Sequence, residues 1–379
     1  MRPAATALAA TLLAFSAIMP LDAQAKPSYQ DAFFAQYPNA RTSLPNCTGC
    51  HEGPAHRTRN AFANAFAANG HAFNAALEAK DSDGDGVTNG DELTANPATD
   101  PSDPRSRPAV TPPAANYQGL FWNAPAGSES GWGINVAHQG DVIFATWFTY
   151  EPSGKALWLS MTAAKTAEGI YTGTLYQTRG PAFRAMPFNP AAVTRTEVGT
   201  GTLTFTDADN GSFAYAAFGV VQTKAITRQV FAPLPTCTFG AQPDLANATN
   251  YQDLWYAAPA DSEAGWGVNL THQGDIIFAT WFTYDADGTA LWLSATAART
   301  APEVYTGTVY RTTGPAFNAA PFLPASVTLA NVGTLTLTFA NGNSADYTYT
   351  LALDGPASAV TQTKAITRQV FRAPGTMCR

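Results

Sequence analysis

Two cysteines and a histidine stand together in the stretch PNCTGCHEGPAH. Cys47 and Cys50 are three positions apart, and His51 follows directly. This is the spacing that attaches haem c, because two thiols must reach the vinyl groups of one porphyrin while the imidazole reaches its iron. A zinc site would need further ligands nearby, a thioredoxin-like pair would need a βαβ context, and a simple disulfide would leave His51 unexplained. The sequence therefore predicts a covalent haem c with His51 as the proximal iron ligand.

A second iron ligand has to come from elsewhere in the same region. Methionine is the usual partner of histidine in cytochromes c, but residues 26–104 contain no methionine. His56 is too close to His51 in sequence to reach the opposite face of a haem. His71 lies further on, beside Gly70, in a segment rich in phenylalanine. We therefore expect His71 to be the distal ligand, with an open iron site as the alternative.

The segment DSDGDGVTNGDE matches the calcium-loop pattern D-x-D-x-D-G-x5-E without a gap. In such loops carboxylates and one backbone carbonyl surround the ion, and a glycine permits the sharp turn. The expected ligands are Asp81, Asp83, Asp85, Val87 through its carbonyl, Asn89 through water, and Glu92. The Asn96-Pro97 pair must end the following helix early. We expect one structural Ca²⁺ in an EF-hand-like or thrombospondin type 3-like loop, with a solvated acidic loop as the alternative.

Residues 29 to about 104 resemble the small monohaem c-type cytochrome modules of secreted bacterial proteins. The resemblance rests on a YP helix, the CxxCH motif and the DSDGDG loop in this order. It implies a small all-α domain that transfers electrons, with Cys47, Cys50 and His51 carrying the haem. The chain departs from such modules after the motif, where it reads NAFANAF in place of a sequence such as NPYG. This departure leaves the far side of the haem undefined.

The beginning of the chain predicts export. One arginine precedes an apolar run that ends in Ala23-Gln24-Ala25, the pattern of a signal peptide over residues 1–25. The apolar run is too short for a membrane anchor, and no later segment could span a bilayer. The net charge of −7 argues against a nucleic-acid partner, which would need a basic surface. We expect a protein of the periplasm, the cell surface or the exterior.

A long internal repeat fills the rest of the chain. The sequence NYQGLFWNAPAGSESGWG from Asn116 recurs as NYQDLWYAAPADSEAGWG from Asn250, and both copies close with QTKAITRQVF. Each copy contains about eight β-branched and aromatic strands joined by short turns, which favours an antiparallel up-and-down β-barrel, with a β-sandwich as the alternative. The predicted domains are a haem domain over 26–104, a proline-rich linker over 105–115, β repeats over 116–237 and 250–379, and a linker over 238–249.

Both repeats carry the same polar side chains at matching positions. These are His138/His272, Asp141/Asp275, Glu129/Glu263, Lys224/Lys364 and Arg228/Arg368. They form no nucleophile–base pattern and no metal-ligand spacing. We interpret them as turn and strand-end residues and a solvated basic stripe, with a binding surface as the alternative. Cys237 and Cys378 follow the last strand of each repeat, and an oxidising compartment favours a disulfide between them.

Together these patterns predict an exported electron-transfer protein rather than an enzyme. It would hold one haem c and one structural Ca²⁺, and its β modules would dock it to a redox partner, a surface or a polymer. A haem peroxidase, or a gas or redox sensor with an open iron site, is the first alternative. An extracellular surface-binding protein is the second.

Overall fold

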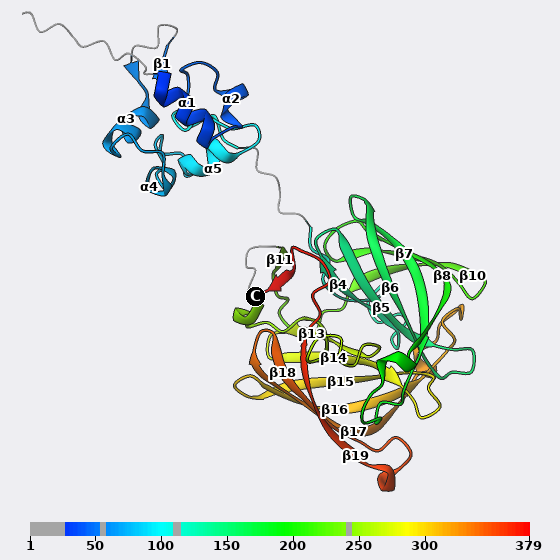
Figure 1. Ribbon diagram of the computed structural model, residues 1–379. Helices are drawn as coiled ribbons and strands as arrows, with labels where there is room; N and C mark the ends of the chain where they lie inside the picture. The colour runs from blue at the N-terminus through cyan, green and yellow to red at the C-terminus, as the bar shows by residue number, and fades with distance from the viewer. Residues whose placement is uncertain (1–26, 54–57, 109–114, 240–244) are drawn as a thin grey trace, which may run out of the picture. The chain divides into compact units, whose positions relative to one another are not determined.

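The computed structural model describes residues 27–53, 58–108, 115–239 and 245–379. The expected signal peptide and His56 lie outside these residues. The chain divides into two compact units, Met1–Thr111 and Pro112–Arg379, and each is described by itself (Figure 1). Within the described residues no helix has the length and apolarity needed to cross a membrane.

The first unit combines short helices with one small sheet. Its elements are α1 (Pro27–Gln36), α2 (Ala40–Ser43), β1 (His51–Glu52), β2 (Thr58–Arg59), α3 (Ala61–Ala68), α4 (Ala75–Glu78) and α5 (Asn89–Thr94). The side chains of Asn60 and Asn74 cap α3 and α4 by accepting hydrogen bonds from backbone amides. The antiparallel pairing of β1 with β2 aligns His51 with Arg59. The expected all-α cytochrome domain is therefore not what the structure shows.

The core of the first unit is aromatic. Phe33, Tyr37 and Phe62 are almost fully buried, and the core also includes Phe66, Leu77 and Leu93. Gly70 and His71 both have positive φ angles, 69° and 61°, so the chain turns sharply between α3 and α4. This turn allows Phe73, which follows it, to stack on Phe66 at 4.3 Å between ring centroids.

The second unit consists of two closed antiparallel barrels of eight strands each (Figure 1). The first barrel contains β3 (Gly119–Asn123), β4 (Gly133–Gln139), β5 (Val142–Tyr150), β6 (Ala156–Ala167), β7 (Ile170–Arg179), β8 (Thr194–Phe205), β9 (Asn210–Ala217) and β10 (Val220–Arg228). The second contains β12 (Asp253–Ala257), β13 (Gly267–Gln273), β14 (Ile276–Tyr284), β15 (Ala290–Ala301), β16 (Val304–Thr313), β17 (Thr328–Asn341), β18 (Ser344–Leu351) and β19 (Val360–Arg368).

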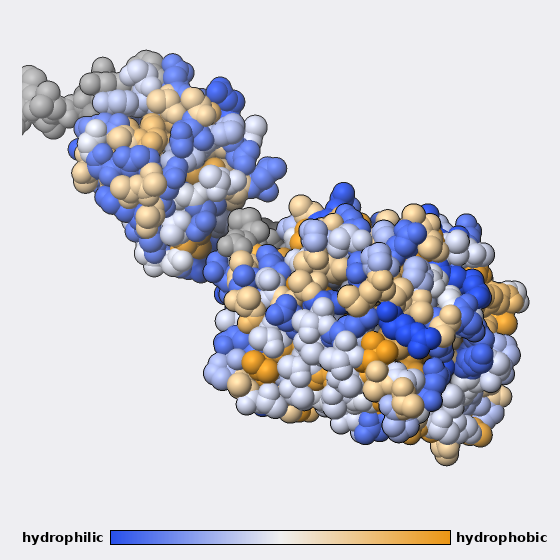
Figure 2. All heavy atoms as spheres, turned by 60° about the horizontal axis from the view of Figure 1, so that its bottom comes forward, coloured by the Kyte–Doolittle hydropathy of each residue, from blue (hydrophilic) through white to orange (hydrophobic). Residues whose placement is uncertain are grey.

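Strand order follows chain order in both barrels, and the last strand pairs with the first. Closure removes exposed sheet edges, as the repeated hairpins predicted, and excludes the β-sandwich. Alternate residues point inward, so that strands such as Ser344–Leu351 alternate between exposed and buried positions. The face shown in Figure 2 is mostly hydrophilic or of intermediate hydropathy, with scattered apolar side chains. Most of the large aromatic residues of the two barrels are buried in their cores.

The basic residues of the last strands are not the solvated stripe that we expected. Lys224 and Arg228 lie on the same face of β10 as the buried Ile226, and this face points into the barrel. Lys224 donates a hydrogen bond to Glu129 at 2.5 Å, and Lys364 does the same to Glu263 at 2.6 Å. The apolar residue between the two cations is the sign that this face is internal. These cations are structural and paired.

Each barrel sends its C-terminal segment across to the other barrel. We name residues 229–236 strap 1 and residues 369–375 strap 2. Gln273 of the second barrel donates to the carbonyl of Gln229 at 2.8 Å, and Gln139 of the first donates to the carbonyl of Gln369 at 2.9 Å. Beyond the straps, β11 (Cys237–Phe239) pairs with β20 (Thr376–Cys378), and a disulfide joins Cys237 to Cys378. The two barrels are therefore fastened to each other reciprocally.

Candidate functional site

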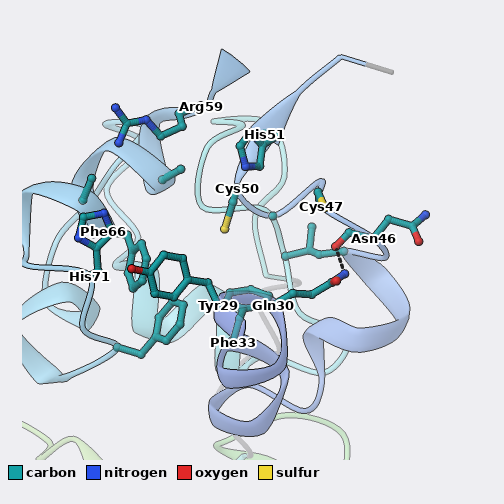
Figure 3. A pocket seen from close by; sticks show the side chains of 15 residues that line it. Tyr29, Gln30, Phe33, Asn46, Cys47, Cys50, His51, Arg59, Phe66 and His71 are labelled. Carbon is teal, nitrogen blue, oxygen red and sulfur yellow. Dashed lines mark hydrogen bonds between the residues drawn. The ribbon is translucent and has the colours of Figure 1, made fainter. Parts of the chain in front are cut away.

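The first unit contains a cavity of about 260 Å³ (Figure 3). Tyr29 and Phe33 from α1 form one side, and Phe66 from α3 forms another. The turn that carries Cys47, Cys50 and His51 borders it, as do Arg59 and His71. The structure thus brings the motif residues and His71 to one cavity.

A tight turn positions the two cysteines. The amides of Cys50 and His51 both donate to the carbonyl of Cys47, at 3.1 and 2.9 Å. Next to this turn, Gln30 donates to the carbonyl of Asn46 at 2.6 Å and so ties the turn to α1. Both cysteines are free thiols in the structure. Burial, and then the nearby Cys47 and Asp100, raises the pKa of the Cys50 thiol to about 12, so this thiol is protonated at neutral pH and is a weak nucleophile.

His71 is held by aromatic rings on the wall of the cavity. Its imidazole stacks on Tyr29 with ring centroids 5.5 Å apart, and it meets Phe66 edge-to-face at 5.4 Å. His71 lies in the turn after α3 with a left-handed backbone conformation. Such a conformation in a residue other than glycine is uncommon. The packing of the ring against Tyr29 and Phe66 holds it in place.

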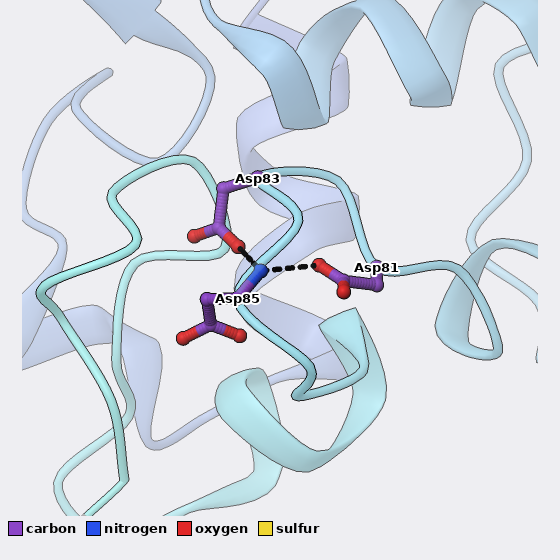
Figure 4. A group of neighbouring side chains, drawn as sticks. All are labelled: Asp81, Asp83 and Asp85. Atoms are coloured by element: carbon purple, nitrogen blue, oxygen red, sulfur yellow. Dashed lines mark hydrogen bonds between the residues drawn. The ribbon is translucent and has the colours of Figure 1, made fainter.

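The acidic loop gathers three of its expected ligands. Carboxylate oxygens of Asp81, Asp83 and Asp85 lie within 4.8 Å of one another (Figure 4). Asp81 accepts hydrogen bonds from the amides of Gly84 and Gly86, at 2.8 and 2.9 Å, and these bonds lower the pKa of its carboxyl group. The loop therefore gathers carboxylate oxygens, which are the ligand type that a hard cation prefers.

Glu92, at the closing position of the loop, is completely buried. One of its carboxylate oxygens accepts a hydrogen bond from Thr99 at 3.1 Å, while the other is buried and has no hydrogen-bond partner. Burial, reinforced by Asp83 and Asp85, raises the pKa of Glu92 to about 7. A buried carboxylate oxygen without a donor is costly unless a cation compensates it. The donor set therefore fits Ca²⁺.

Asn89, the expected ligand through water, makes direct hydrogen bonds within the protein. The side-chain oxygen of Asn89 accepts from the amide of Ser82 at 3.2 Å, and its amino group donates to the carbonyl of Leu77 at 2.9 Å. Asn89 thus ties the loop to the aromatic core. Arg107, which no sequence pattern singled out, has its guanidinium 2.9 Å from a carboxylate oxygen of Asp85. Its position in the proline-rich segment gave no sign of this contact.

In the barrels, the paired histidines have structural roles. His138 and His272 each accept a hydrogen bond at Nδ1 from a tyrosine amide, that of Tyr117 or Tyr251, at 3.0 Å. Burial lowers the pKa of His138 to about 3 and that of His272 to about 4. Both are therefore neutral at physiological pH.

These buried histidines predict a pH dependence of barrel stability. In the unfolded chain each titrates near pH 6.5, so the unfolded state takes up protons first as the pH falls. The free energy of unfolding is expected to decrease from about pH 6.5 down to pH 4, by up to about 1.4 kcal/mol per pH unit for each histidine. This pH dependence is measured by denaturant unfolding of the wild type and of His138→Asn, whose side chain keeps a hydrogen-bond acceptor. In the variant, the decrease in unfolding free energy that the two histidines cause should be about half as large as in the wild type. Identical pH profiles for the two proteins would contradict the assignment of this decrease to the buried histidines.

The first unit matches a known protein family. Residues 25–107 match the family model of the temptin C-terminal domain. No curated protein matches the chain. The solved structure of intact Ap-TbpB (N and C lobes) is similar at 6% sequence identity with a TM-score of 0.21, over 65% of this chain and 62% of that chain. The chain thus spans less than two thirds of that protein, and a likeness of this size establishes no shared property.

The family match corrects the prediction for the first unit. The matched residues cover the whole of the region that we identified as a cytochrome module, and the matching family is the temptin C-terminal domain rather than a cytochrome. The haem electron carrier is therefore wrong, and so are the haem peroxidase and the gas or redox sensor, since all three depended on that identification. The YP helix, the CxxCH motif and the DSDGDG loop, even in this order, were too little of the sequence to define the family. The match does not test the chemical state of Cys47 and Cys50, so the covalent attachment of haem c at these two thiols stays a prediction.

Proposed function

We propose that the chain is an extracellular binding protein whose first unit binds a small apolar ligand and is stabilised by Ca²⁺. The cavity beside Cys50 and His71 is the observation that carries this proposal. Preformed cavities with aromatic walls and a few converging polar groups are the usual form of a small-molecule site. The disulfide between Cys237 and Cys378 supports an oxidising compartment outside the cytoplasm.

The calcium loop and the cavity share one core. Asn89 joins the loop to the carbonyl of Leu77, and Leu77 is buried in the same cluster as Phe33 and Phe66, which line the cavity. A cation that neutralises the acidic groups around Glu92 would hold α5 and α4 in place. Ca²⁺ would in this way keep the aromatic walls in their binding arrangement.

A fluorescent apolar probe tests the proposed cavity. N-phenyl-1-naphthylamine should bind to the full chain with a saturable rise in emission. Ala67→Trp should abolish this rise, because Ala67 lines the cavity and an indole would fill it. Ala68→Trp is the matched control, since Ala68 is the next residue of α3 and is exposed. This control should bind the probe as the wild type does.

The mass of the intact exported protein is measured alongside the titration. Free thiols at Cys47 and Cys50 together with loss of binding only in Ala67→Trp would support a reversible ligand. Equal binding by the wild type and both variants would place the probe elsewhere and overturn the proposal. A covalent group on either thiol that fills the cavity would also overturn it, because the cavity would then hold a fixed group.

A further inference from the structure

The two barrels carry matching aromatic clusters at equivalent ends. In the first, His138 stacks on Tyr117 with centroids 5.4 Å apart and meets Tyr171 edge-to-face at 5.0 Å. In the second, the corresponding distances from His272 are 5.5 Å to Tyr251 and 5.2 Å to Tyr305. The internal repeat therefore provides two copies of one arrangement, and any difference between them is informative.

One ring distinguishes the two clusters. Phe239, the last residue of β11, lies against His138 in the first barrel with centroids 4.8 Å apart and ring planes at 88°. In the described part of the chain, the only rings against His272 are those of Tyr251 and Tyr305. Phe239 reaches His138 from an extended segment of the same chain. Its contact shows that this arrangement of side chains accepts an aromatic ring.

Beside His272 the structure has a cavity of about 450 Å³, which we name the His272 cavity. Tyr251, His272 and Tyr305 form its aromatic wall, and residues 233–235 of strap 1 contribute two prolines and a leucine. The charged residues around it are balanced, with Asp275 and Glu303 opposed by Arg299 and Arg379. Arg299 and Asp275 lie 3.4 Å apart. The aromatic wall, together with charged side chains of both signs in equal number, favours a neutral ring over an ion.

We propose that the His272 cavity binds a neutral aromatic ring from outside the chain, in the way that His138 receives Phe239. The ring contacts the imidazole edge-to-face, which is the geometry that Phe239 has against His138 in the first barrel. Its source is either a small aromatic molecule or the side chain of an extended peptide. This site is separate from the cavity of the first unit and does not depend on the function proposed for that cavity.

Two fluorinated probes test the proposal by fluorine NMR. N-acetyl-4-fluorophenylalanine amide represents a peptide ring and 4-fluorophenol represents a small molecule. The full chain carrying Ala67→Trp is used throughout, so that the cavity of the first unit is filled. Saturable line broadening with one site per chain is expected for at least one probe. Tighter binding of the first probe indicates a peptide source, and tighter binding of the second indicates a small molecule.

Three further variants locate the bound ring. Thr249→Trp should abolish binding, because Thr249 is exposed and lines the His272 cavity. Ala115→Trp, at the matching position before the first barrel, should leave binding at one site per chain. Phe239→Ala should open the equivalent place beside His138 and raise the number of sites to two. If this variant does not fold, the first two variants still decide the question.

The proposal is overturned if the fluorine line of neither probe broadens. It is also overturned if Thr249→Trp binds the probes as tightly as its parent chain does. It is equally overturned if Ala115→Trp abolishes binding while Thr249→Trp does not, since the ring would then sit at the first barrel. A folded Phe239→Ala variant that still binds at one site would show that the ring of Phe239 is no guide to the ligand.

Discussion

Glu92→Gln is expected to remove most of the stabilisation that Ca²⁺ gives to the first unit. The wild-type unit should melt at a higher temperature with Ca²⁺ than with a chelator, because binding to the folded state stabilises it by mass action. At an ion concentration one hundred times the dissociation constant this amounts to about 2.7 kcal/mol. For a domain of this size the shift is on the order of 10–20 °C. The amide of the variant cannot offer a charged bidentate ligand from the buried position of Glu92.

Asp31→Asn is the matched control for this experiment. Asp31 is exposed in α1, so its replacement removes one negative charge without touching the loop. It should keep the full calcium response, and the barrel unit should melt at the same temperature with and without chelator. Calorimetry of the full chain separates the two transitions. A calcium response of equal size in Glu92→Gln and in the wild type would count against the calcium site.

Asp253→Asn is expected to destabilise the second barrel by about 3–5 kcal/mol, because it leaves a buried cation without its counter-charge. Asp253 and Arg368 lie 3.2 Å apart, and each side chain is only 1% exposed. Burial raises the pKa of the Asp253 carboxyl group, while the Arg368 guanidinium opposes this rise. The guanidinium also donates to the backbone carbonyls of Asn250 and Gln252, so the variant loses charge balance more than hydrogen bonds.

The first barrel supplies the control for Asp253→Asn. Its position 119 is glycine, and Arg228 instead pairs with Asp209, whose side chain is 53% exposed. Asp209→Asn should therefore cost no more than about 1 kcal/mol. Urea unfolding of the two variants compares the free energies directly. Equal losses in both would mean that burial does not govern the strength of these ion pairs.

The architecture of the barrels could be predicted from the sequence because the repeat, the alternation and the short turns agree with one another. Whether the strand face that carries the basic residues points into the barrel or out to solvent was harder to predict. Lys224 and Arg228 indicated a polar face, and Ile226 between them indicated a buried one. Only the contact with Glu129, far away in sequence, shows how a lysine is accommodated inside. Contacts of this kind depend on the closed barrel rather than on local pattern.

The first unit shows a different limit. The pattern of the acidic loop fixes the residue type at enough positions to predict how the loop folds. The structure brings Asp81, Asp83 and Asp85 together as this pattern predicts. The segment around Cys47 and Cys50 is much shorter, and the same residue types serve more than one chemistry. The wall of the cavity comes from Tyr29, Phe66 and other residues far apart in the chain. No local motif marks these residues as neighbours.

The disulfide between Cys237 and Cys378 makes the second barrel part of a covalent ring, because every strand of that barrel lies between the two cysteines. A protease that cuts one hairpin of this barrel would leave a single molecule, and the fragments would separate only after reduction. A cut in a hairpin of the first barrel would lie outside the ring and leave its two products without a covalent link. The two barrels, built from the same sequence repeat, therefore differ in their resistance to fragmentation.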